Sequence, residues 1–381
     1  MPRQTDIIAL SAPNPGSTRH LRVHRYGAPG LGPKAYLHSS LHADEWPGLL
    51  VLHHLTRMLD EADGEGRITG EIVLLPYANP LGLGQRVNGD LVGRYHLDGG
   101  GNFNRGWPDL TQTAGDAVDG KLGEDTNANI RLIREALKSA VDDLSDETEL
   151  EELRRTLMGL SVDADIVLDL HCDQLATFHV YANYAQLEDA TTLTRDLGSP
   201  VLLLEDEAGG GSFDEANHAP WIKLQKRFGL DEAVARHCFA VTVELRGETD
   251  VTDKLAEQDA KALLRFLMRK GVVSGDPGPL PDMINDPTPL DGVDVPKAPA
   301  SGVLAWHVRP GDTVVKGQVI ADLVDIEADD PTSARTPIHA GTSGFLFARR
   351  AAVLVRPGDQ LCKIAGAEAL DYRKSGALLS P

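Results

Sequence analysis

Residues 35–59 read AYLHSSLHADEWPGLLVLHHLTRML, and this stretch decides the fold. Its first four residues form a mostly apolar run that predicts a strand, and residues 47–59 repeat apolar side chains at helical spacing. The apolar residues of the helix share one stripe, made of Leu49, Leu52, Leu55, Met58 and Leu59. The stretch therefore predicts a strand, a polar loop and a helix, with His42 and Glu45 in the loop.

The remainder of residues 1 to about 275 alternates short apolar runs with helix-period segments. A closing helix is expected at residues 254–270. Further strands are expected at residues 72–75, 166–170, 178–181, 201–204 and 240–245. Strands that alternate with helices indicate an α/β fold, with a largely parallel sheet flanked by helices.

A second candidate strand ends in VLDLH at residues 167–171 and offers His171. The carboxyl ends of strands line the ligand crevice of an open α/β sheet, so we expect His42, Glu45 and His171 to converge there. Two histidines and one carboxylate leave a tetrahedral zinc ion with one position open for water, which is typical of a hydrolase. We predict one Zn²⁺ per chain. The alternative for His42 and Glu45 alone is a turn with a capping carboxylate.

Asp169 precedes His171 by two residues and has two possible roles. It could be a buried polar group that the backbone satisfies, or it could orient a ligand histidine through a hydrogen bond.

A glycine-rich segment carries the candidates for substrate contact. The string GNFNR at residues 101–105 contains Asn104 and Arg105, a pair suited to a carboxylate because arginine donates two parallel hydrogen bonds and the amide adds a third. Arg86 and Arg94 lie upstream, and either could polarise a substrate carbonyl. The alternative is an ordinary surface arginine in a turn.

Glu244 ends an otherwise apolar strand, AVTVE at residues 240–244. A carboxylate there is costly unless it is paired or faces a cleft. As a general base it would take a proton from water and later give it to the leaving amine. The alternative is a structural ion pair with Arg246 or Lys254.

Composition and charge exclude several classes of partner. The chain has 37 Lys plus Arg and 57 Asp plus Glu, a formal charge of −20, which repels phosphate backbones and anionic lipids. We therefore expect no nucleic-acid and no membrane partner, and no apolar run is long enough to span a bilayer. Three cysteines give no disulfide framework and favour a cytoplasmic location. A homo-oligomer is possible.

The chain is expected to divide into two domains. Residues 1–275 form the first, with an acidic helical insertion at 123–160, and residues 276–296 form a proline-rich linker. In residues 297–381 the strings SGVL and RPGD, at 301–304 and 309–312, are followed by SGFL and RPGD at 343–346 and 356–359. This repeat predicts a small pseudo-symmetric β-rich domain.

In this order, the strings H-x-x-E, N-P, N-x-N-R, D-L-H and V-E-L resemble the succinylglutamate desuccinylase/aspartoacylase family, over about residues 35–270. That family has a zinc-carboxypeptidase-like fold. The resemblance implies that His42, Glu45 and His171 bind zinc and that Glu244 is the general base. It also implies that Asn104 and Arg105 grip the substrate carboxylate and that Arg94, which precedes a tyrosine, polarises the carbonyl. Arg86 stays open as an alternative to Arg94.

Two departures from the family pattern concern the substrate pocket. Ala43 stands where the family often has glycine, and Arg246 intervenes before Gly247, so Arg246 could reshape the acyl or amine pocket. The C-terminal repeat resembles a biotinyl/lipoyl half-barrel. Because no lysine lies between Gly317 and Cys362, this domain is not expected to be lipoylated, and it would pack on the catalytic domain or mediate assembly.

These features predict a zinc-dependent amidohydrolase that removes the acyl group from an N-acyl amino acid or a similar small carboxylate-bearing amide. The first alternative is a metallocarboxypeptidase that acts on peptides. The second is a non-catalytic binding protein with a structural metal, which would require a fourth protein ligand.

Overall fold

The computed structural model describes residues 2–207 and 209–373, and its largest element is a nine-stranded sheet. The strand order is β1-β2-β4-β3-β9-β13-β11-β12-β14. The strands are β1 (Gln4–Leu10), β2 (Arg19–Tyr26), β3 (Lys34–Ser39), β4 (Glu71–Leu75), β9 (Ile166–Asp173), β11 (His179–Asn183), β12 (Val201–Glu205), β13 (Phe239–Gly247) and β14 (Thr288–Pro289). The six strands expected from the sequence are all present, and the N-terminal hairpin β1-β2 was not expected.

The centre of the sheet is parallel, and its edges are mixed. β4, β3, β9 and β13 run parallel to one another, whereas β2 and β11 pair with this block in the antiparallel sense. The carboxyl ends of β3, β9 and β13 therefore meet at one edge of the sheet. The prediction of a largely parallel α/β sheet is confirmed, and the antiparallel edge strands make the sheet mixed.

Helices cover both faces of the sheet, because neighbouring strand residues point to opposite sides. Tyr36 and Val73 pack into one core together with residues of α3, α4, α5 and α7, while Leu37 and Leu74 pack into the other with α1, α6 and α9. The helices are α1 (Pro47–Gly64), α3 (Thr111–Val118), α4 (Thr126–Asp142), α5 (Glu149–Ser161), α6 (Leu187–Leu197), α7 (Phe213–Phe228) and α9 (Asp253–Arg269). Short helices complete the fold at α2 (Pro80–Leu83), α8 (Glu232–Ala235), η1 (Tyr184–Gln186) and η2 (Leu290–Gly292).

Residues 123–160 contain α4 and most of α5, as the acidic, helix-like composition predicted. Each helix also buries an apolar face, with Ile133 and Leu137 on α4 and Leu153 and Leu157 on α5 in the first core. The charged face is therefore solvated, but the segment is also part of the core of the main body.

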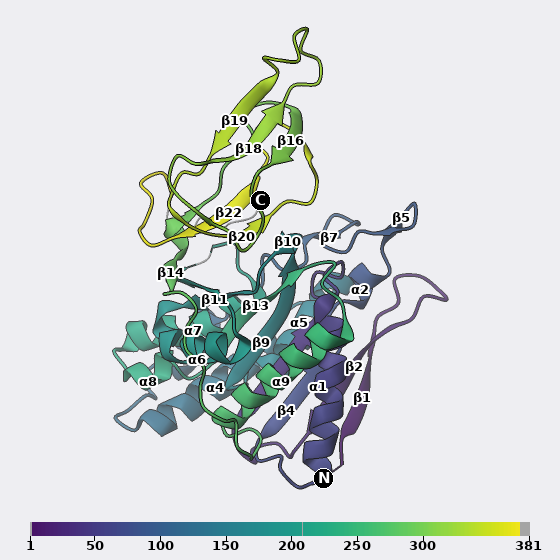
Figure 1. Cartoon of the computed structure of the whole chain (residues 1–381). Helices are drawn as coiled ribbons and strands as arrows, with labels where there is room; N and C mark the ends of the chain where they lie inside the picture. Colours follow the sequence, from purple (N-terminus) through teal and green to yellow (C-terminus); the bar gives the residue numbers. More distant parts are fainter. Residues whose placement is uncertain (1, 208, 374–381) are drawn as a thin grey trace.

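The C-terminal strands, together with the short strand β10 from the main body, form two small sheets that stand over the carboxyl ends of β9 and β13 (Figure 1). One contains β10-β20-β22-β15 with β17 beside β20, and the other contains β19-β18-β16-β21. These strands are β10 (Leu175–Ala176), β15 (Val293–Asp294), β16 (Gly302–Trp306), β17 (Thr313–Val314), β18 (Val319–Val324), β19 (Arg335–His339), β20 (Gly344–Arg349), β21 (Leu354–Val355) and β22 (Cys362–Gly366).

The sequence repeat is visible in the turn geometry of these sheets. In both RPGD strings the aspartate side chain accepts from the N–H of its arginine, at 3.0 Å for Asp312 and Arg309 and 2.9 Å for Asp359 and Arg356. The glycine between them has a positive φ in both copies, 101° and 88°. The repeat thus folds as two similar turns.

The proline-rich segment 276–296 connects the two parts of the chain and pairs with both of them. Its strand β14 pairs with β12 of the main sheet, and its strand β15 pairs with β22 above. The segment is therefore hydrogen-bonded to both parts near its carboxyl end.

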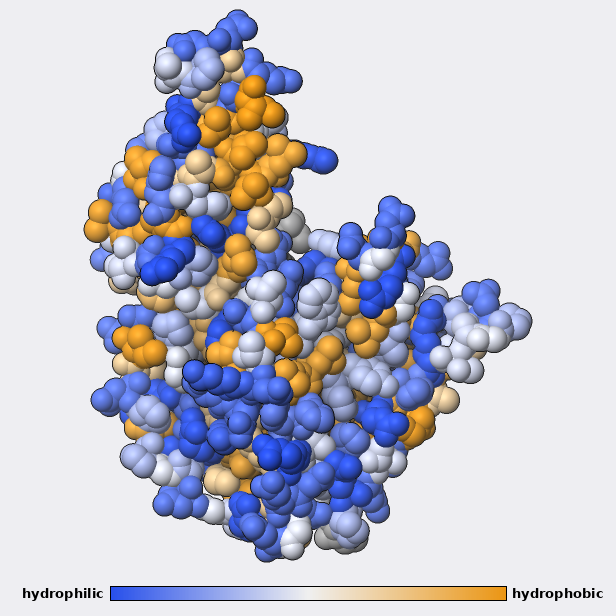
Figure 2. Space-filling model, turned by 45° about the vertical axis from the view of Figure 1, so that its right-hand side comes forward, coloured by the Kyte–Doolittle hydropathy of each residue, from blue (hydrophilic) through white to orange (hydrophobic). Residues whose placement is uncertain are grey.

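The surface of the C-terminal strands carries apolar side chains (Figure 2). Leu354 on β21 is 68% exposed, and Val353 before it is 45% exposed. In residues 2–207 and 209–373, no helix has both the length and the apolar character needed to cross a membrane.

Candidate metal-centred active site

The loop after β3 carries two of the three candidate ligands. It begins at Ser40, whose φ of 54° is rarely adopted by residues other than glycine. The Ser40 hydroxyl donates to the carbonyl of Glu45 (3.0 Å), and the Ala43 N–H donates to the carbonyl of Gly93 (3.0 Å). These bonds fold the loop so that His42 and Glu45 face the end of β9.

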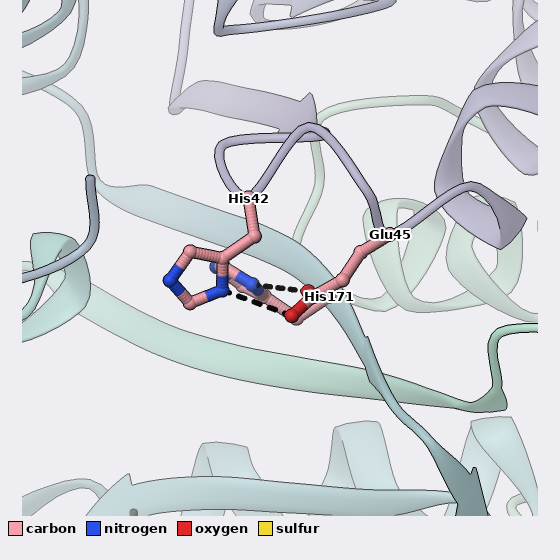
Figure 3. A group of neighbouring side chains, drawn as sticks. All are labelled: His42, Glu45 and His171. Carbon is pink, nitrogen blue, oxygen red and sulfur yellow. Dashed lines mark hydrogen bonds and ion pairs between the residues drawn. The ribbon is translucent and has the colours of Figure 1, made fainter. Parts of the chain in front are cut away.

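The structure brings His42, Glu45 and His171 together, and Figure 3 shows their side chains pointing toward one another. One ligand atom from each residue lies within 4.8 Å of the other two, and all three residues are buried. His42 Nδ1 is 2.9 Å from Glu45 Oε1, and His171 Nδ1 is 2.7 Å from Glu45 Oε2. The backbone N–H of Cys172 also donates to Glu45 Oε2 (3.1 Å).

Oxygen atoms hold the outer ring nitrogens of both histidines. His42 Nε2 is 2.8 Å from Asn102 Oδ1, and His171 Nε2 is 2.8 Å from Asp169 Oδ1. The N–H of Asn104 donates to the same Asn102 atom (2.8 Å), which identifies it as the amide oxygen. Because these oxygens only accept, each Nε2 carries a proton, and the Nδ1 of a neutral ring then presents a lone pair to Glu45.

Lone pairs at such distances repel one another unless positive charge lies between them. Two additional protons would supply that charge, and so would one divalent metal ion. Nitrogen and carboxylate oxygen are zinc ligands, and ligand histidines usually donate their other N–H to a carboxylate or carbonyl. The donor set of His42, Glu45 and His171 therefore fits a metal ion such as zinc.

The electrostatics of the three residues agree with this arrangement. Burial alone would raise the pKa of Glu45, but His42, His171 and Arg94 hold it well below its ordinary value. Burial would lower the pKa of His171, but Asp169 and Glu45 outweigh burial and hold it well above its ordinary value. Burial lowers the pKa of His42, so the paired charges of the cluster are those of Glu45 and His171.

Glu244 lies beside His171 in the parallel register of β9 and β13 and lines the same cavity. Its Oε2 atom is buried and has no hydrogen-bond partner in the described part of the chain. Burial, with repulsion from Glu45 and Asp173, raises the pKa of Glu244 to about 8. A carboxyl group with an unused oxygen and a raised pKa is suited to transferring a proton.

Arg246 does not line the cavity, so the expectation that it reshapes the acyl or amine pocket is wrong. A β-bulge lies between Glu244 and Gly247, and Arg246 has a φ of 64° within it. The guanidinium instead donates to both oxygens of Asp259 on α9, at 2.8 and 2.6 Å. Among the described residues no ion pair joins Glu244 to Arg246 or Lys254.

The two candidate arginines of the glycine-rich segment have different environments. Arg94 lines the cavity, and its Nη2 donates to Glu45 Oε1 (2.6 Å). Arg86 begins β5 (Arg86–Val87), which pairs with β6 (Asp90–Leu91) in an exposed hairpin, and it donates to the carbonyl of Gly89 (3.1 Å). The structure thus places Arg94 at the site and Arg86 outside it.

Asn104 and Arg105 both line the cavity and follow the small hairpin of β7 (Tyr95–His96) and β8 (Gly101–Asn102). Asn104 is buried, its Nδ2 lies 3.2 Å from His171 Nε2, and its Oδ1 accepts from the Phe213 N–H (2.8 Å). Arg105 is partly buried, and burial together with Arg94 lowers its pKa. Its Nη1 donates to the carbonyl of Asn104 (2.6 Å).

The cavity has a volume of about 650 Å³ and two walls, one from the main sheet and one from the C-terminal strands. The C-terminal strands form the second wall because one of them, β20, pairs with β10, a short strand that comes shortly after His171. Lys363 of β22 donates to Asp173 Oδ2 at the end of β9 (2.5 Å), and the Ala351 N–H donates to Gln174 Oε1 (2.8 Å). The prediction that the C-terminal part packs on the catalytic part agrees with this geometry.

The cavity does not share the negative charge of the whole chain. Six cationic and six acidic side chains line it. They are Arg94, Arg105, Lys297, Arg349, Arg350 and Lys363, and Glu45, Asp173, Glu205, Asp214, Glu244 and Asp359. Local arginines and lysines thus offset the overall negative field within the cavity.

Sequence reasoning missed several residues of this site, among them Asn102 and Lys363. Asn102 accepts a hydrogen bond from His42. The only sequence feature that could have identified Asn102 is its place as the first asparagine of the N-x-N-R string. Lys363 reaches the cavity through the packing of the C-terminal strands, and no local pattern around it carries that information.

Residues 31–269 match the family model described as the succinylglutamate desuccinylase/aspartoacylase catalytic domain. Among curated proteins, the chain is 27% identical over 353 residues to the N-alpha-acetyl-L-2,4-diaminobutyric acid deacetylase of Halomonas elongata, covering 88% of this chain and 83% of that protein.

Solved structures of similar fold cover nearly the whole chain. Family proteins of Shewanella amazonensis and Shewanella frigidimarina have TM-scores of 0.83 and 0.85, at 24% and 22% identity, with 96% of this chain covered in each case and 98% and 97% of theirs. The product-bound ectoine utilization protein EutE (DoeB) of Ruegeria pomeroyi has a TM-score of 0.66 at 18% identity, covering 96% of this chain and 95% of its own. The fold, including the C-terminal strands, is therefore shared.

The ion pair between Lys363 and Asp173 predicts a measurable contribution to stability. Both side chains are about four-fifths buried, with 17% and 19% exposure, so Lys363→Met leaves Asp173 without its partner. We expect a loss of about 2–4 kcal/mol in the free energy of unfolding, measured by denaturant titration. The matched control is Lys261→Met, which breaks an exposed pair with Glu257 and should cost less than about 0.5 kcal/mol. Equal effects of the two substitutions would contradict a structural role for the buried pair.

Proposed function

Because the chain belongs to the succinylglutamate desuccinylase/aspartoacylase family, we propose that it is a zinc-dependent amidohydrolase. Its substrate would be an N-acyl amino acid or a similar small amide that bears a carboxylate. The observation that carries the proposal is the convergence of His42, Glu45 and His171 in a cavity that also contains Glu244 and Arg94.

His42, Glu45 and His171 would hold one zinc ion, which supplies Lewis acidity by lowering the pKa of water and polarising a carbonyl oxygen. Among the described residues, the candidate cluster contains three protein donors, which favours a catalytic site over a structural one. This supports an enzyme rather than a non-catalytic binding protein.

Glu244 would act as the general base and then as the general acid. Its unpartnered Oε2 would accept a proton from the attacking water, and the same oxygen would return that proton to the leaving amine. The raised pKa near 8 suits a group that holds a proton between these two events.

Arg94 would stabilise the negative charge that develops on the carbonyl oxygen of the substrate. Its contact with Glu45 fixes the guanidinium beside the metal ligands, so that little reorganisation is needed during the reaction.

Arg105 would bind the substrate carboxylate. Asn104 was predicted to share that role through its amide, but this amide is bonded to Phe213 and approaches His171. We propose that Asn104 instead orients Arg105, whose Nη1 donates to its carbonyl. The carboxylate would then enter next to the metal ligands, with the amide bond toward Glu244.

The C-terminal strands favour small substrates over long peptides, since Lys363 and its neighbours close one side of the cavity. The deacetylase activity named for the Halomonas relative supports an acyl amino acid, whereas the metallocarboxypeptidase alternative needs room for a peptide.

We also propose that these strands form a biotinyl/lipoyl-like half-barrel that carries no lipoyl group. No lysine lies between Gly317 and Cys362, and the next lysine, Lys363, is ion-paired with Asp173. Assembly into a homo-oligomer stays a prediction.

The proposal predicts a specific substrate profile and a metal requirement. Purified protein should hydrolyse members of a panel of N-acyl amino acids, lose activity after chelation, and regain activity when Zn²⁺ is added. Short peptides with free amino termini serve as the comparison. Preferential cleavage of those peptides would favour the carboxypeptidase, and full activity in the chelated protein would contradict zinc dependence.

Glu244→Gln should lower kcat by about 10²- to 10⁴-fold, because the substitution removes the group that transfers the proton. Zinc content, measured by atomic absorption, should stay at one ion per chain since the three ligands are intact. The control is Glu257→Gln on the surface of α9, which should retain wild-type kcat. A near-normal rate in Glu244→Gln would remove this residue from the mechanism.

Arg94 and Arg86 provide a matched pair of substitutions in one segment. Arg94→Met should reduce kcat by about 10²- to 10³-fold, since it removes a donor for the developing oxyanion. Arg86→Met, in the exposed hairpin, should leave kcat and KM unchanged. The reverse order of effects in steady-state kinetics would show that the roles are exchanged.

A further inference from the structure

A line of buried polar side chains leads from the core of the sheet to His171. Tyr36 OH lies 2.8 Å from His38 Nδ1, and His38 Nε2 lies 2.7 Å from Asp169 Oδ1. The same Asp169 oxygen is 2.8 Å from His171 Nε2. Tyr36, His38 and Asp169 are fully buried at 0% exposure, so water does not compete for these bonds.

Strand geometry creates this line. Tyr36 and His38 are two residues apart on β3 and share one face, as Asp169 and His171 do on β9. His38 pairs directly with Asp169 in the parallel register of the two strands. A Tyr-x-His string beside an Asp-x-His string thus places the four side chains in a row.

The hydrogen bonds in this line have one consistent direction. Asp169 Oδ1 only accepts, so His38 Nε2 and His171 Nε2 both donate to it. In neutral His38 the Nδ1 atom is then an acceptor, and the Tyr36 hydroxyl donates to it. In a neutral His171 ring the same logic leaves Nδ1 unprotonated and directed at Glu45, where the metal ion would lie.

Packing holds the line in place from one side. The Phe213 ring lies 4.6 Å from the His38 ring and 5.8 Å from the Tyr36 ring, measured between centroids. The Phe213 N–H donates to Asn104 Oδ1, and Asn104 Nδ2 is 3.4 Å from Asp169 Oδ2. Both oxygens of Asp169 are therefore engaged, which leaves the carboxylate one orientation.

The two candidate ligand histidines differ in this support. His42 Nε2 is held by the neutral amide oxygen of Asn102, whose Nδ2 has no partner among the described residues. His171 is held by the charged carboxylate of Asp169, which also accepts hydrogen bonds from His38 and Asn104. More hydrogen-bonded polar groups therefore support His171 than His42. Buried polar groups of this kind destabilise a fold unless every one is hydrogen-bonded.

We propose that Tyr36 and His38 are positioning residues, which act through Asp169 to fix the tautomer and ring orientation of His171 for metal binding. This inference rests on the zinc site of the proposed function. Neither residue touches the cavity, so their contribution is to metal affinity rather than to contact with substrate.

The test is the zinc dissociation constant of purified full-length variants, measured by competition with a chromophoric chelator. His38→Leu should weaken zinc binding by about 10- to 100-fold, and Tyr36→Phe should fall at the lower end of that range. The control is Tyr26→Phe, a buried strand tyrosine whose hydroxyl donates to Asp60 (2.9 Å), away from the ligands. Its zinc affinity should equal that of the wild type.

Two more readouts separate positioning from general stability. The melting temperature of the metal-free protein should fall similarly in Tyr36→Phe and Tyr26→Phe, whereas the visible spectrum of the Co²⁺-loaded protein should change only in Tyr36→Phe. If His38→Leu does not fold, Tyr36→Phe decides the matter, since it removes only one hydroxyl. Wild-type zinc affinity and an unchanged Co²⁺ spectrum in Tyr36→Phe would overturn the inference and leave the proposed function intact. A wild-type protein that binds no zinc would overturn both.

Discussion

The structure depends on one electrostatic constraint, the convergence of two imidazole nitrogens and one carboxylate in a buried space. His42 and His171 each donate from Nε2 to an oxygen acceptor, so in the neutral rings their Nδ1 atoms face Glu45 as lone pairs. Such a cluster is stable only with positive charge at its centre. The ends of β3 and β9, the strained loop at Ser40 and the polar residues behind the histidines all serve to hold these three groups in place.

The cavity above this cluster is assembled from distant parts of the chain. β10, immediately after the ligand strand, pairs with β20, and the Lys363–Asp173 ion pair lies two residues from His171. The C-terminal strands are thereby coupled to the strand that carries a candidate ligand. A displacement of these strands would alter both the size of the cavity and its balance of charge.

Much of the fold and of the site could be predicted from sequence, because the relevant signals are local. Alternating apolar runs identified the central strands, and the strings around His42, His171 and Glu244 identified groups at strand ends, where an α/β sheet gathers its ligands. Arg94 could be distinguished from Arg86 only from the hairpin that carries Arg86, which the sequence does not reveal. The orientation of Arg246 likewise depends on the β-bulge. Lys363 and the Tyr36–His38 pair depend on tertiary packing and strand register, which no single segment encodes.

The most direct test of the central claim is anomalous diffraction at the zinc edge from crystals of the zinc-loaded protein. We expect one strong peak about 2.0–2.2 Å from the Nδ1 atoms of His42 and His171 and from a carboxylate oxygen of Glu45, with a non-protein atom in the fourth position. A peak elsewhere, or a fourth ligand from the protein at this position, would contradict a catalytic metal centre here.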